Sequence, residues 1–456
     1  MTYSAGDSGH VAVHNAIDAT QASVIAAAAA SAASAALSAS LVGAPADAAV
    51  AAVVGDPASD TAIVLSSTYG PSVTYVPSTG VEATDTAAIV AAHTALPANG
   101  GTIRLDSGPY LWTADTVSFT KAVHLIGSGP SGVSAASGSS FLNTGTTINC
   151  ASATGVAIAV NSDGCSFEKL ALFNTAGSTP TAGAGIQITT KGKSTRVVDC
   201  SFNGFWTNLE FVQGYEWYID RCHFFDPVTF GIRLRDTDIA DAGDGIISNC
   251  FIYAGPTHLT PTAGIQWESG GGIKVLGTKI NRRGTTAKFT VGINFQVADG
   301  ISTSVAVVTG NSIENTAYGV LVQQSAGGTG IFSKINISDN EIMTGSNYGI
   351  AVGPANTGMI SGVVIAGNVG NGGGGLISIS KADKIDIGIN TTVTGTPLVV
   401  GASVTNLFLA PGYSFTTAAR PAATAMRAGS TYYDTTLSKQ AWSDGTNWKD
   451  AAGTNI

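Results

Sequence analysis

The sequence predicts an all-β fold, a parallel β-helix in which each rung holds three short strands. One observation behind this prediction is a five-residue motif in which a small, an aliphatic, a polar, a bulky apolar and usually another polar residue follow each other. A second motif keeps the same step along the chain. Two interleaved motifs that recur every 23 to 33 residues indicate one structural unit per recurrence, as in a solenoid. The first motif starts at Gly185, Asn208, Gly231, Gly264, Gly292, Gly319 and Gly349, and the second ends at Phe202, Phe224, Ile252, Ile313, Ile342 and Val369.

The pattern inside each motif predicts strands. Apolar and polar residues alternate over four or five positions, as in a half-buried strand, and no helical stripe occurs between the motifs. Equivalent strands of successive rungs are expected to pair about 4.8 Å apart, in a coil that is right-handed by default. We therefore expect inward columns, one of Ile232, Ile265 and Ile293 and another of Leu234, Trp267 and Phe295.

The second motif gives most cysteines a structural role. Asparagine bonds backbone groups at a sharp bend, so stacked asparagines would satisfy the turns from one rung to the next. A cysteine at the same place is expected to be a small buried filler. The five cysteines have no paired spacing and are predicted to be free thiols. Cys200, Cys222 and Cys250 stand where later repeats have Asn311, Asn340 and Asn368.

The composition excludes several classes of protein. The chain has 456 residues, of which 44% are hydrophobic, only 11% are charged and 57 are glycine, unlike a disordered chain or a helical enzyme. A net charge of -9 argues against a nucleic-acid partner, which requires basic stripes. No run of large apolar residues is long enough to span a bilayer, and no basic region precedes an apolar stretch at the N-terminus. We therefore expect no membrane insertion and no secretion signal.

Residues 1–80 are predicted to form a helical attachment or stalk segment. Alanine and serine dominate from Asn15 to Leu41, a composition that favours helix but supplies too little bulk to fold alone. Such a helix needs partners, and its small side chains suit close packing in a bundle of identical chains. Pro45 and Pro57 interrupt the segment, so its helices are expected to be short.

Residues 81–410 are predicted to be a capped parallel β-helix. Thr84 or Asp85 is expected to N-cap a helix with Ile89 and His93 on one face. The run T-D-T-A-A-I-V-A-A-H-T-A-L-P-A-N-G-G-T-I-R-L-D-S-G-P-Y-L-W resembles the N-terminal part of pectate-lyase-like right-handed β-helix proteins. The resemblance covers most of this region and implies a helix that plugs the open end of the solenoid.

Residues 411–456 are predicted to form a small β module. The motifs Y-Y-D-T-T-L, A-W and D-G-T-N-W, in this order, suggest short strands around tight turns. They resemble a terminal module found at the ends of many bacteriophage tail-fibre and tailspike proteins. Tyr433, Trp442 and Trp448 are expected to form the core of the module, and sugar stacking by one exposed tryptophan is the alternative.

The three segments together resemble a phage tailspike or tail fibre. The resemblance implies a homotrimer that binds other virion tail or baseplate proteins through residues 1–80. It also implies that the β-helix or the distal end binds a host cell-surface polysaccharide. The implied location is the virion tail, after assembly in the host cytoplasm.

The outward positions of the first motif form two predicted polar columns on one face of the solenoid, the kind of surface that binds extended polymers. Charged residues concentrate in three consecutive rungs. One column holds Gln187, Glu210, Arg233, Gln266 and Asn294, and the other holds Thr189, Val212, Arg235, Glu268, Gln296 and Gln323.

These columns supply candidates for glycan chemistry. Glycoside cleavage requires two carboxyl groups, about 5 Å apart for retention and about 6.5 to 9.5 Å apart for inversion. Glu210 and Glu268, two rungs apart, are the predicted catalytic pair, and Asp236 and Asp238 in the adjacent acidic turn are further candidates. In a lyase, an arginine or another base would instead take a proton beside an acidic sugar. The predicted carbohydrate-binding residues are Arg233, Arg235, Gln266, Asn294, Gln296 and Trp206.

Simpler interpretations also fit these residues. The charged side chains would form a surface ladder of opposite charges on neighbouring rungs, or a carbohydrate-binding face without chemistry. The acidic turn from Asp236 to Asp244 suits a solvated loop or a calcium site. No cofactor is predicted, because the dinucleotide-like run from Gly127 to Gly132 is not followed by a helical stripe. No residue is assigned as a metal ligand. Two functions therefore remain, a receptor-binding tailspike that degrades a host polysaccharide and a structural or adhesive tail fibre without cleavage.

Overall fold

A computed structural model describes most of the chain beyond residue 72. The described ranges are 73–129, 145–189, 192–235, 242–258, 260–268, 271–282, 288–297, 302–324, 331–353, 360–393 and 396–456. The chain divides into two compact units, Met1–Thr74 and Tyr75–Ile456, and nearly all described residues belong to the second unit. The predicted attachment segment of residues 1–80 lies almost entirely outside the described residues.

The described part begins with β1 (Val73–Val76) and the helix α4 (Glu82–Ala95). The helix starts earlier than predicted, because its N-cap position is Val81, so the expected caps at Thr84 and Asp85 are wrong. Asp85 is fully buried instead, and its carboxylate accepts hydrogen bonds from the backbone N–H groups of Thr79 and Leu111. These bonds tie the helix to the first rung of the solenoid, so the carboxylate fixes the position of the cap.

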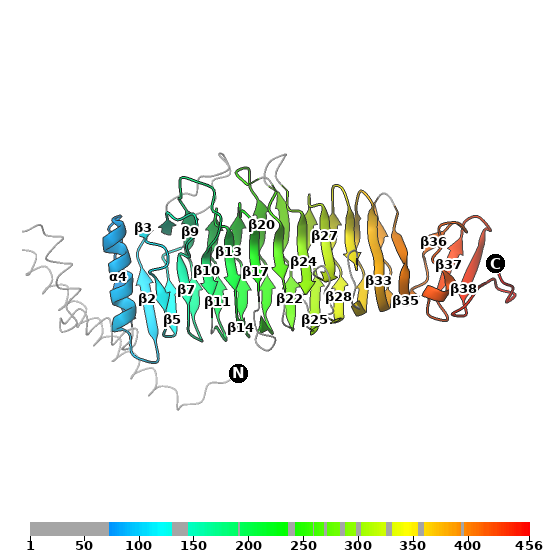
Figure 1. Cartoon of the computed structure of the whole chain (residues 1–456), viewed down its shortest axis with the longest axis horizontal. Helices are drawn as coiled ribbons and strands as arrows, with labels where there is room; N and C mark the ends of the chain where they lie inside the picture. Colours follow the sequence, from blue (N-terminus) through cyan, green and yellow to red (C-terminus); the bar gives the residue numbers. More distant parts are fainter. Residues whose placement is uncertain are drawn as a thin grey trace, which may run out of the picture. The chain divides into compact units, whose positions relative to one another are not determined.

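The first strand of each rung forms one parallel series (Figure 1). Ile232 pairs with Ile265 and Ile265 with Ile293, and all three side chains are buried, which confirms the predicted inward column. Leu234, Trp267 and Phe295 form the adjacent column, also as predicted. The series comprises β4 (Ser118–Phe119), β7 (Ile158–Val160), β10 (Ala184–Ile188), β13 (Thr207–Phe211), β17 (Phe230–Leu234), β21 (Ala263–Trp267), β24 (Val291–Val297), β27 (Tyr318–Gln324), β30 (Tyr348–Val352) and the first parts of β33 (Gly375–Ile387) and β35 (Leu398–Leu409).

The second and third strands of each rung repeat the same parallel pairing. The second series comprises β2 (Gly101–Leu105), β5 (Val123–Ile126), β8 (Ser166–Glu168), β11 (Arg196–Val198), β15 (Tyr218–Asp220), β19 (Ile246–Ser248), β22 (Ile273–Leu276), β25 (Ser302–Thr309), β28 (Ile331–Ser338), β31 (Ile360–Ala366) and the ends of β33 and β35. The third series comprises β3 (Gly108–Trp112), β6 (Thr146–Cys150), β9 (Ala171–Asn174), β12 (Ser201–Asn203), β16 (His223–Phe225), β20 (Phe251–Ala254), β23 (Lys279–Arg282), β26 (Ser312–Glu314), β29 (Glu341–Met343), β32 (Val369–Asn371) and β34 (Thr391–Thr392). Three short strands per rung around one apolar interior confirm the predicted parallel β-helix.

The predicted stack of asparagines lies at the bend between the second and third strands, and we call it the bend column. Asn311 donates its side-chain Nδ2 hydrogen to Asn340 Oδ1 at 2.9 Å, and Asn340 donates in the same way to Asn368 at 2.9 Å. The backbone N–H of Asn311 also donates to Asn340 Oδ1, at 3.0 Å. The backbone is left-handed at the residue before each of these positions, for example at Asp339 with a φ of 56°. Earlier rungs place Cys200, Cys222 and Cys250 in the same column, and all five cysteines are buried free thiols, as predicted.

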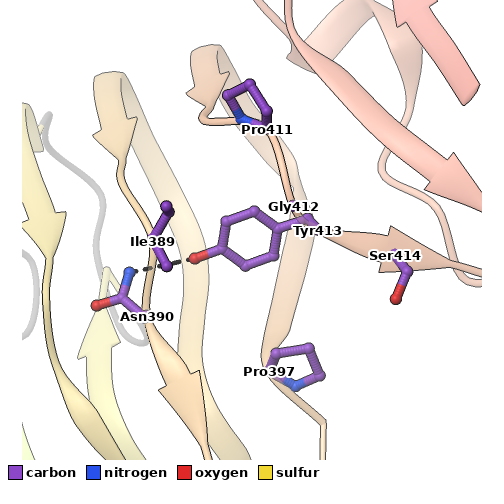
Figure 2. A pocket seen from close by; sticks show the side chains of 7 residues that line it. All are labelled: Ile389, Asn390, Pro397, Pro411, Gly412, Tyr413 and Ser414. Atoms are coloured by element: carbon purple, nitrogen blue, oxygen red, sulfur yellow. Dashed lines mark hydrogen bonds between the residues drawn. The ribbon is translucent and has the colours of Figure 1, made fainter.

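The bend column ends at Tyr413, beyond the last rung. Asn368 donates to Asn390, and Asn390 donates to the Tyr413 hydroxyl at 3.1 Å (Figure 2). The hydroxyl in turn donates to the backbone oxygen of Gly388 at 2.9 Å. A pocket of about 150 Å³ surrounds this contact and is lined by Ile389, Asn390, Pro397, Pro411, Gly412, Tyr413 and Ser414.

The last described residues form a small sheet of four strands with a short 3-10 helix. Tyr432 and Trp448 pack edge to face with ring centroids 4.6 Å apart and form its core. Trp448 was predicted to be in this core, but the same prediction for Tyr433 and Trp442 is wrong, because these side chains are 47% and 38% exposed. The elements are β36 (Ser414–Phe415), η1 (Ala423–Ala425), β37 (Thr431–Asp434), β38 (Lys439–Ser443) and β39 (Trp448–Lys449).

Among the described residues, no helix is both long enough and apolar enough to cross a bilayer.

Candidate functional site

The predicted polar columns exist and lie in register on the outer face of the first strand series. Gln187 pairs with Glu210, Glu210 with Arg233, Arg233 with Gln266, and Gln266 with Asn294. In the second column, Gln296 pairs with Gln323. The sequence pattern placed these side chains on the outer face, but three of the first column are covered. Glu210, Gln266 and Asn294 are 5%, 2% and 2% exposed. We call the whole set, from Gln187 to Gln323, the polar ladder.

Arg233 is the centre of the charged part of the polar ladder. Its Nε donates to Glu268 Oε1 at 3.0 Å and its Nη2 donates to Glu268 Oε2 at 3.0 Å, which is a bidentate ion pair. On the other side, Arg233 Nη1 lies 3.5 Å from Glu210 Oε1. Glu210 also lies 3.6 Å from Arg235 Nε and accepts a hydrogen bond from Gln187 Nε2 at 2.6 Å. The four charges therefore form one alternating network across three rungs.

Amide side chains continue the polar ladder in the next rungs. Asn294 donates to Gln266 Oε1 at 2.8 Å, and Gln266 donates to Gln296 Oε1 at 3.2 Å. Gln323 then donates to Asn294 Oδ1 at 3.3 Å. Each amide has a partner on its own or a neighbouring rung. The buried Gln266 and Asn294 thereby hold the partly exposed Gln296 and Gln323 in place, one rung or about 4.8 Å apart.

An apolar column lies beside the polar ladder, and sequence reasoning missed it. Arg233 places its guanidinium carbon 5.0 Å from the centroid of the Phe230 ring, so the apolar column also supports the charged network. The sequence signal for this column is the apolar or aromatic residue that precedes the glycine of the first motif, from Gly231 onward. That glycine must lack a side chain, because a Cβ on Gly231 would lie 2.6 Å from the Gly264 oxygen. The column comprises Phe230, Ala263, Val291, Tyr318 and Tyr348, and it packs with Leu321 and Ala351, which continue the register of Gln266 and Asn294 in later rungs.

The loops that lead into β17 and β21 are joined by Asp226 and His258. The Asp226 carboxylate accepts hydrogen bonds from the backbone N–H groups of Thr257 at 3.2 Å and His258 at 3.0 Å. Burial opposes ionisation, but hydrogen bonds from His258 and Thr257 hold the pKa of Asp226 below its usual value. Burial likewise opposes a charged imidazole, yet Asp226 raises the pKa of His258 above its usual value. This contact positions the beginnings of the strands that carry Arg233 and Gln266.

The remaining predicted residues contribute less to the described site. Asp236 and Asp238 lie outside the described residues, so their catalytic role stays a prediction. Asp244, at the end of the acidic turn, is exposed. Trp206 is half-buried just before β13, and its backbone oxygen accepts a hydrogen bond from the Thr229 N–H at 2.9 Å. Within the described ranges, no three His, Cys, Asp or Glu side chains come together as a metal site would require.

The geometry of Glu210 and Glu268 suits recognition better than acid catalysis. Two rungs separate them, which corresponds to about 9.6 Å between their strands, near the upper limit of the inverting range. The Arg233 guanidinium occupies the rung between them and contacts both carboxylates. Arg233 therefore fills the space between the two carboxyl groups that an inverting reaction needs for its water. Their catalytic role stays a prediction, as does the binding role of Arg233, Arg235, Gln266, Asn294, Gln296 and Trp206.

Comparison with known proteins agrees with the observed architecture. Residues 184–392 match the model of the family described as "Right handed beta helix region". Together with the parallel three-strand rungs, this match identifies the fold of the region as a right-handed parallel β-helix. No curated protein sequence matches the chain.

Several solved structures resemble the chain at low sequence identity. A DFA-IIIase from Arthrobacter chlorophenolicus A6 in complex with GF2 is 15% identical, with a TM-score of 0.41 over 69% of this chain and 84% of that one. Tailspike protein gp49 from Acinetobacter baumannii bacteriophage Fri1, a capsular polysaccharide depolymerase, is 13% identical, with a TM-score of 0.42 over 71% of this chain and 63% of that one. A polygalacturonase from Erwinia carotovora ssp. carotovora is 12% identical, with a TM-score of 0.46 over 74% and 96%. These similarities concern the fold alone.

Proposed function

We propose that the polar ladder binds a polysaccharide and that the chain is a receptor-binding tailspike or tail fibre of a bacteriophage. The observation that carries the proposal is the succession of polar side chains on consecutive rungs, a charged group from Gln187 to Glu268 followed by a hydrogen-bonded amide group from Gln266 to Gln323. An extended glycan offers hydroxyl groups at regular intervals, which matches a face with donors and acceptors repeated once per rung. The phage assignment rests on the resemblance of the Ala-rich, β-helical and C-terminal segments to tailspikes.

Recognition without cleavage is the first form of this function. Glu268 accepts two hydrogen bonds from Arg233. Glu210 accepts one from Gln187 and lies 3.5 Å from Arg233, so both carboxylates act as acceptors. Cleavage of the same polysaccharide is the second form. The observation behind it is the two-rung separation of Glu210 and Glu268, about 9.6 Å between their strands, which is close to the range of about 6.5 to 9.5 Å that an inverting mechanism requires.

The test uses the full chain with host capsule and cell-wall polysaccharides. Binding is measured by retardation in gels that contain each polysaccharide, and cleavage by size-exclusion chromatography of the glycan after incubation. We expect Gln266→Ala and Arg233→Ala to weaken binding, since each removes groups from the polar ladder. If glycans are shortened, loss of shortening in Glu210→Gln or Glu268→Gln supports the catalytic pair. Unchanged binding in both ladder variants overturns the proposal.

We also propose that the chain is a homotrimer that attaches to virion tail or baseplate proteins through residues 1–80. The Ala-rich composition of Asn15 to Leu41 supports this, since it favours a helix with little side-chain bulk of its own. Native mass spectrometry should give three chains. A monomer at micromolar concentration would contradict the assembly.

A further inference from the structure

A block of four aromatic rings lies on the outer face of the third strand series, away from the polar ladder. The rings belong to His223 and Phe225 on β16 and to Phe251 and Tyr253 on β20. His223 pairs with Phe251 and Phe225 with Tyr253, while Phe224 and Ile252 between them face the interior. We call these four residues the aromatic block. In Figure 1 the third strand series can be followed from its labels β3, β9 and β20.

The rings contact each other in a closed cycle. Phe225 and Tyr253 stack with centroids 5.5 Å apart and planes 6° apart, and Phe251 and Tyr253 lie 6.2 Å apart with planes 9° apart. His223 meets Phe251 edge to face at 5.0 Å and Phe225 at 5.7 Å. Burial lowers the pKa of His223, so its imidazole is neutral near pH 7 and acts as a fourth apolar ring.

The aromatic block is accessible from solvent. Phe251 is 39% exposed, and the other three rings are half-buried. The preceding rung has Ser201 and Asn203 at the equivalent outward positions, and the following rung has Lys279 and Asn281. Four aromatic side chains at adjacent outward positions therefore depart from the polar outer face of the neighbouring rungs, and such a patch marks an interaction site more often than a structural need.

Polar groups border the aromatic block on the β23 side. Lys279 Nζ lies 2.8 Å from Glu314 Oε1, and Asn281 donates to Glu314 Oε2 at 2.9 Å. Ser312 donates to the same carboxylate at 3.0 Å. The Lys279 charge is thus neutralised by Glu314, and the border offers fixed hydrogen-bonding groups without a net charge. Apolar rings beside a few oriented polar groups are the usual composition of a small-molecule or sugar site.

We propose that the aromatic block is a second carbohydrate site, one that takes a neutral pyranose of a glycan chain. The apolar C–H face of the sugar would pack on the ring edges and the exposed part of Phe251, while its hydroxyls bond Asn281 and the Lys279–Glu314 pair. A neutral sugar fits because the ammonium beside the rings is already paired, so a uronic acid would find no unpaired cation among the described residues of this border. The site is separate from the polar ladder and does not depend on the function proposed for it.

The experiment measures retardation of the full chain in native gels that contain hydroxyethyl cellulose, galactomannan or dextran, with polygalacturonate as the acidic comparison. We expect at least one neutral polymer to retard the protein and Phe251→Ser/Tyr253→Ser to weaken this at least tenfold. Phe251→Ser alone, a change at an exposed ring, should weaken it in the same direction with less risk to folding. Val369→Ser is the matched control, because Val369 is 44% exposed in the same outward column but lies outside the block.

Three results would overturn the proposal. One is the absence of retardation by all three neutral polymers, and another is equal retardation of the wild type and the double variant. The third is a change of oligomeric state, since conversion of an oligomer to a monomer by Phe251→Ser/Tyr253→Ser in native mass spectrometry would assign the block to a subunit interface. Gln266→Ala separates the two sites, because it should leave retardation by the neutral polymer unchanged even where it abolishes binding at the polar ladder.

Discussion

Replacement of Asn340 by alanine should destabilise the solenoid more than any other single asparagine change on the same rung. Asn340 is 1% exposed, and its side chain takes part in four hydrogen bonds. Its Oδ1 accepts from the N–H and the Nδ2 of Asn311 at 3.0 and 2.9 Å, and its Nδ2 donates to the Val308 oxygen at 3.0 Å and to Asn368 Oδ1 at 2.9 Å. Alanine removes all four bonds and takes this acceptor from the buried Asn311 N–H, while Asn311 Nδ2 and Asn368 Oδ1 each keep one other bond.

The magnitude follows from these four bonds. A typical intramolecular hydrogen bond contributes about 1 kcal/mol, and a buried group left without a partner costs about 1 to 3 kcal/mol. Relaxation recovers part of this loss, so we expect Asn340→Ala to cost about 3 to 5 kcal/mol. Asn336→Ala is the control on the preceding strand, since Asn336 faces outward and its Oδ1 has no hydrogen-bond partner among the described residues. A change without lost hydrogen bonds should stay within about 0.5 kcal/mol.

Hydrogen–deuterium exchange of peptides that cover residues 302–343 measures the cost locally, which avoids the two-state assumption that a long repeat array violates. Protection of the Asn311 and Asn340 bends should fall strongly in Asn340→Ala and stay near wild type in Asn336→Ala. In a double-mutant cycle, Asn311→Ala and Asn340→Ala should be coupled, because the Asn311 side chain donates to the Asn340 side chain. Equal protection in Asn340→Ala and Asn336→Ala would refute the bend column as a source of stability.

Further predictions concern charge, pH, thiols and the C-terminal module. Arg233→Ala should cost about 2 to 4 kcal/mol in chemical denaturation, because it leaves the buried Glu210 carboxylate with a weaker partner. Lys193→Ala, at an exposed ion pair with Glu216, should have little effect, and the reverse order would contradict the network. The clasp between Asp226 and His258 combines a carboxylate whose pKa is lowered from 3.8 and an imidazole whose pKa is raised from 6.5. Its contribution is complete between these two values, is lost as pH rises through the raised pKa of His258, and is lost as pH falls through the lowered pKa of Asp226. Exchange protection of residues 255–258 should therefore fall from pH 6 to pH 8 in the wild type, and a pH-dependence that persists in His258→Gln would exclude this origin. Burial raises the pKa of Cys150 to about 12 and the pKa of Cys165 to about 11. A disulfide reagent at pH 8 should therefore modify neither thiol in the native protein, and it should modify all five thiols after denaturation. Rapid labelling of the native protein would contradict the described burial. Trp448→Ala should lower the melting temperature of the C-terminal module and cost about 3 to 5 kcal/mol, whereas Trp442→Ala should change it little, and equal effects would contradict the assigned core.

The motif spacing was enough to predict the architecture of the solenoid. Strand pairing in a parallel β-helix places equivalent residues of successive repeats above one another, so the register of Ile232, Ile265 and Ile293 follows directly from the alignment of the motifs. The bend column followed for the same reason, since its positions hold small side chains, cysteine in the earlier rungs, then Thr278, then asparagine in the later rungs. Handedness needed the general preference of parallel crossovers.

Burial on the outer face could not be predicted in the same way. Alternation assigns Glu210 and Gln266 to the side opposite the core, but it does not reveal that side chains such as Phe230 build a second packed layer there. In the C-terminal module the adjacent pair Tyr432 and Tyr433 is ambiguous, because a shift of one residue exchanges the two faces of a strand. The structure places Tyr432 inside and Tyr433 outside.

The direction of the amide bonds in the bend column has a consequence for how this solenoid can be altered. From Asn311 to Asn390 each asparagine donates one Nδ2 hydrogen to the next side chain of the column, toward the C-terminus, so these side-chain bonds all run in one direction and each polarises the next. A duplicated coil that carries asparagine could be inserted here without reversing any dipole. The terminal tyrosine hydroxyl would then close a longer series in the same orientation.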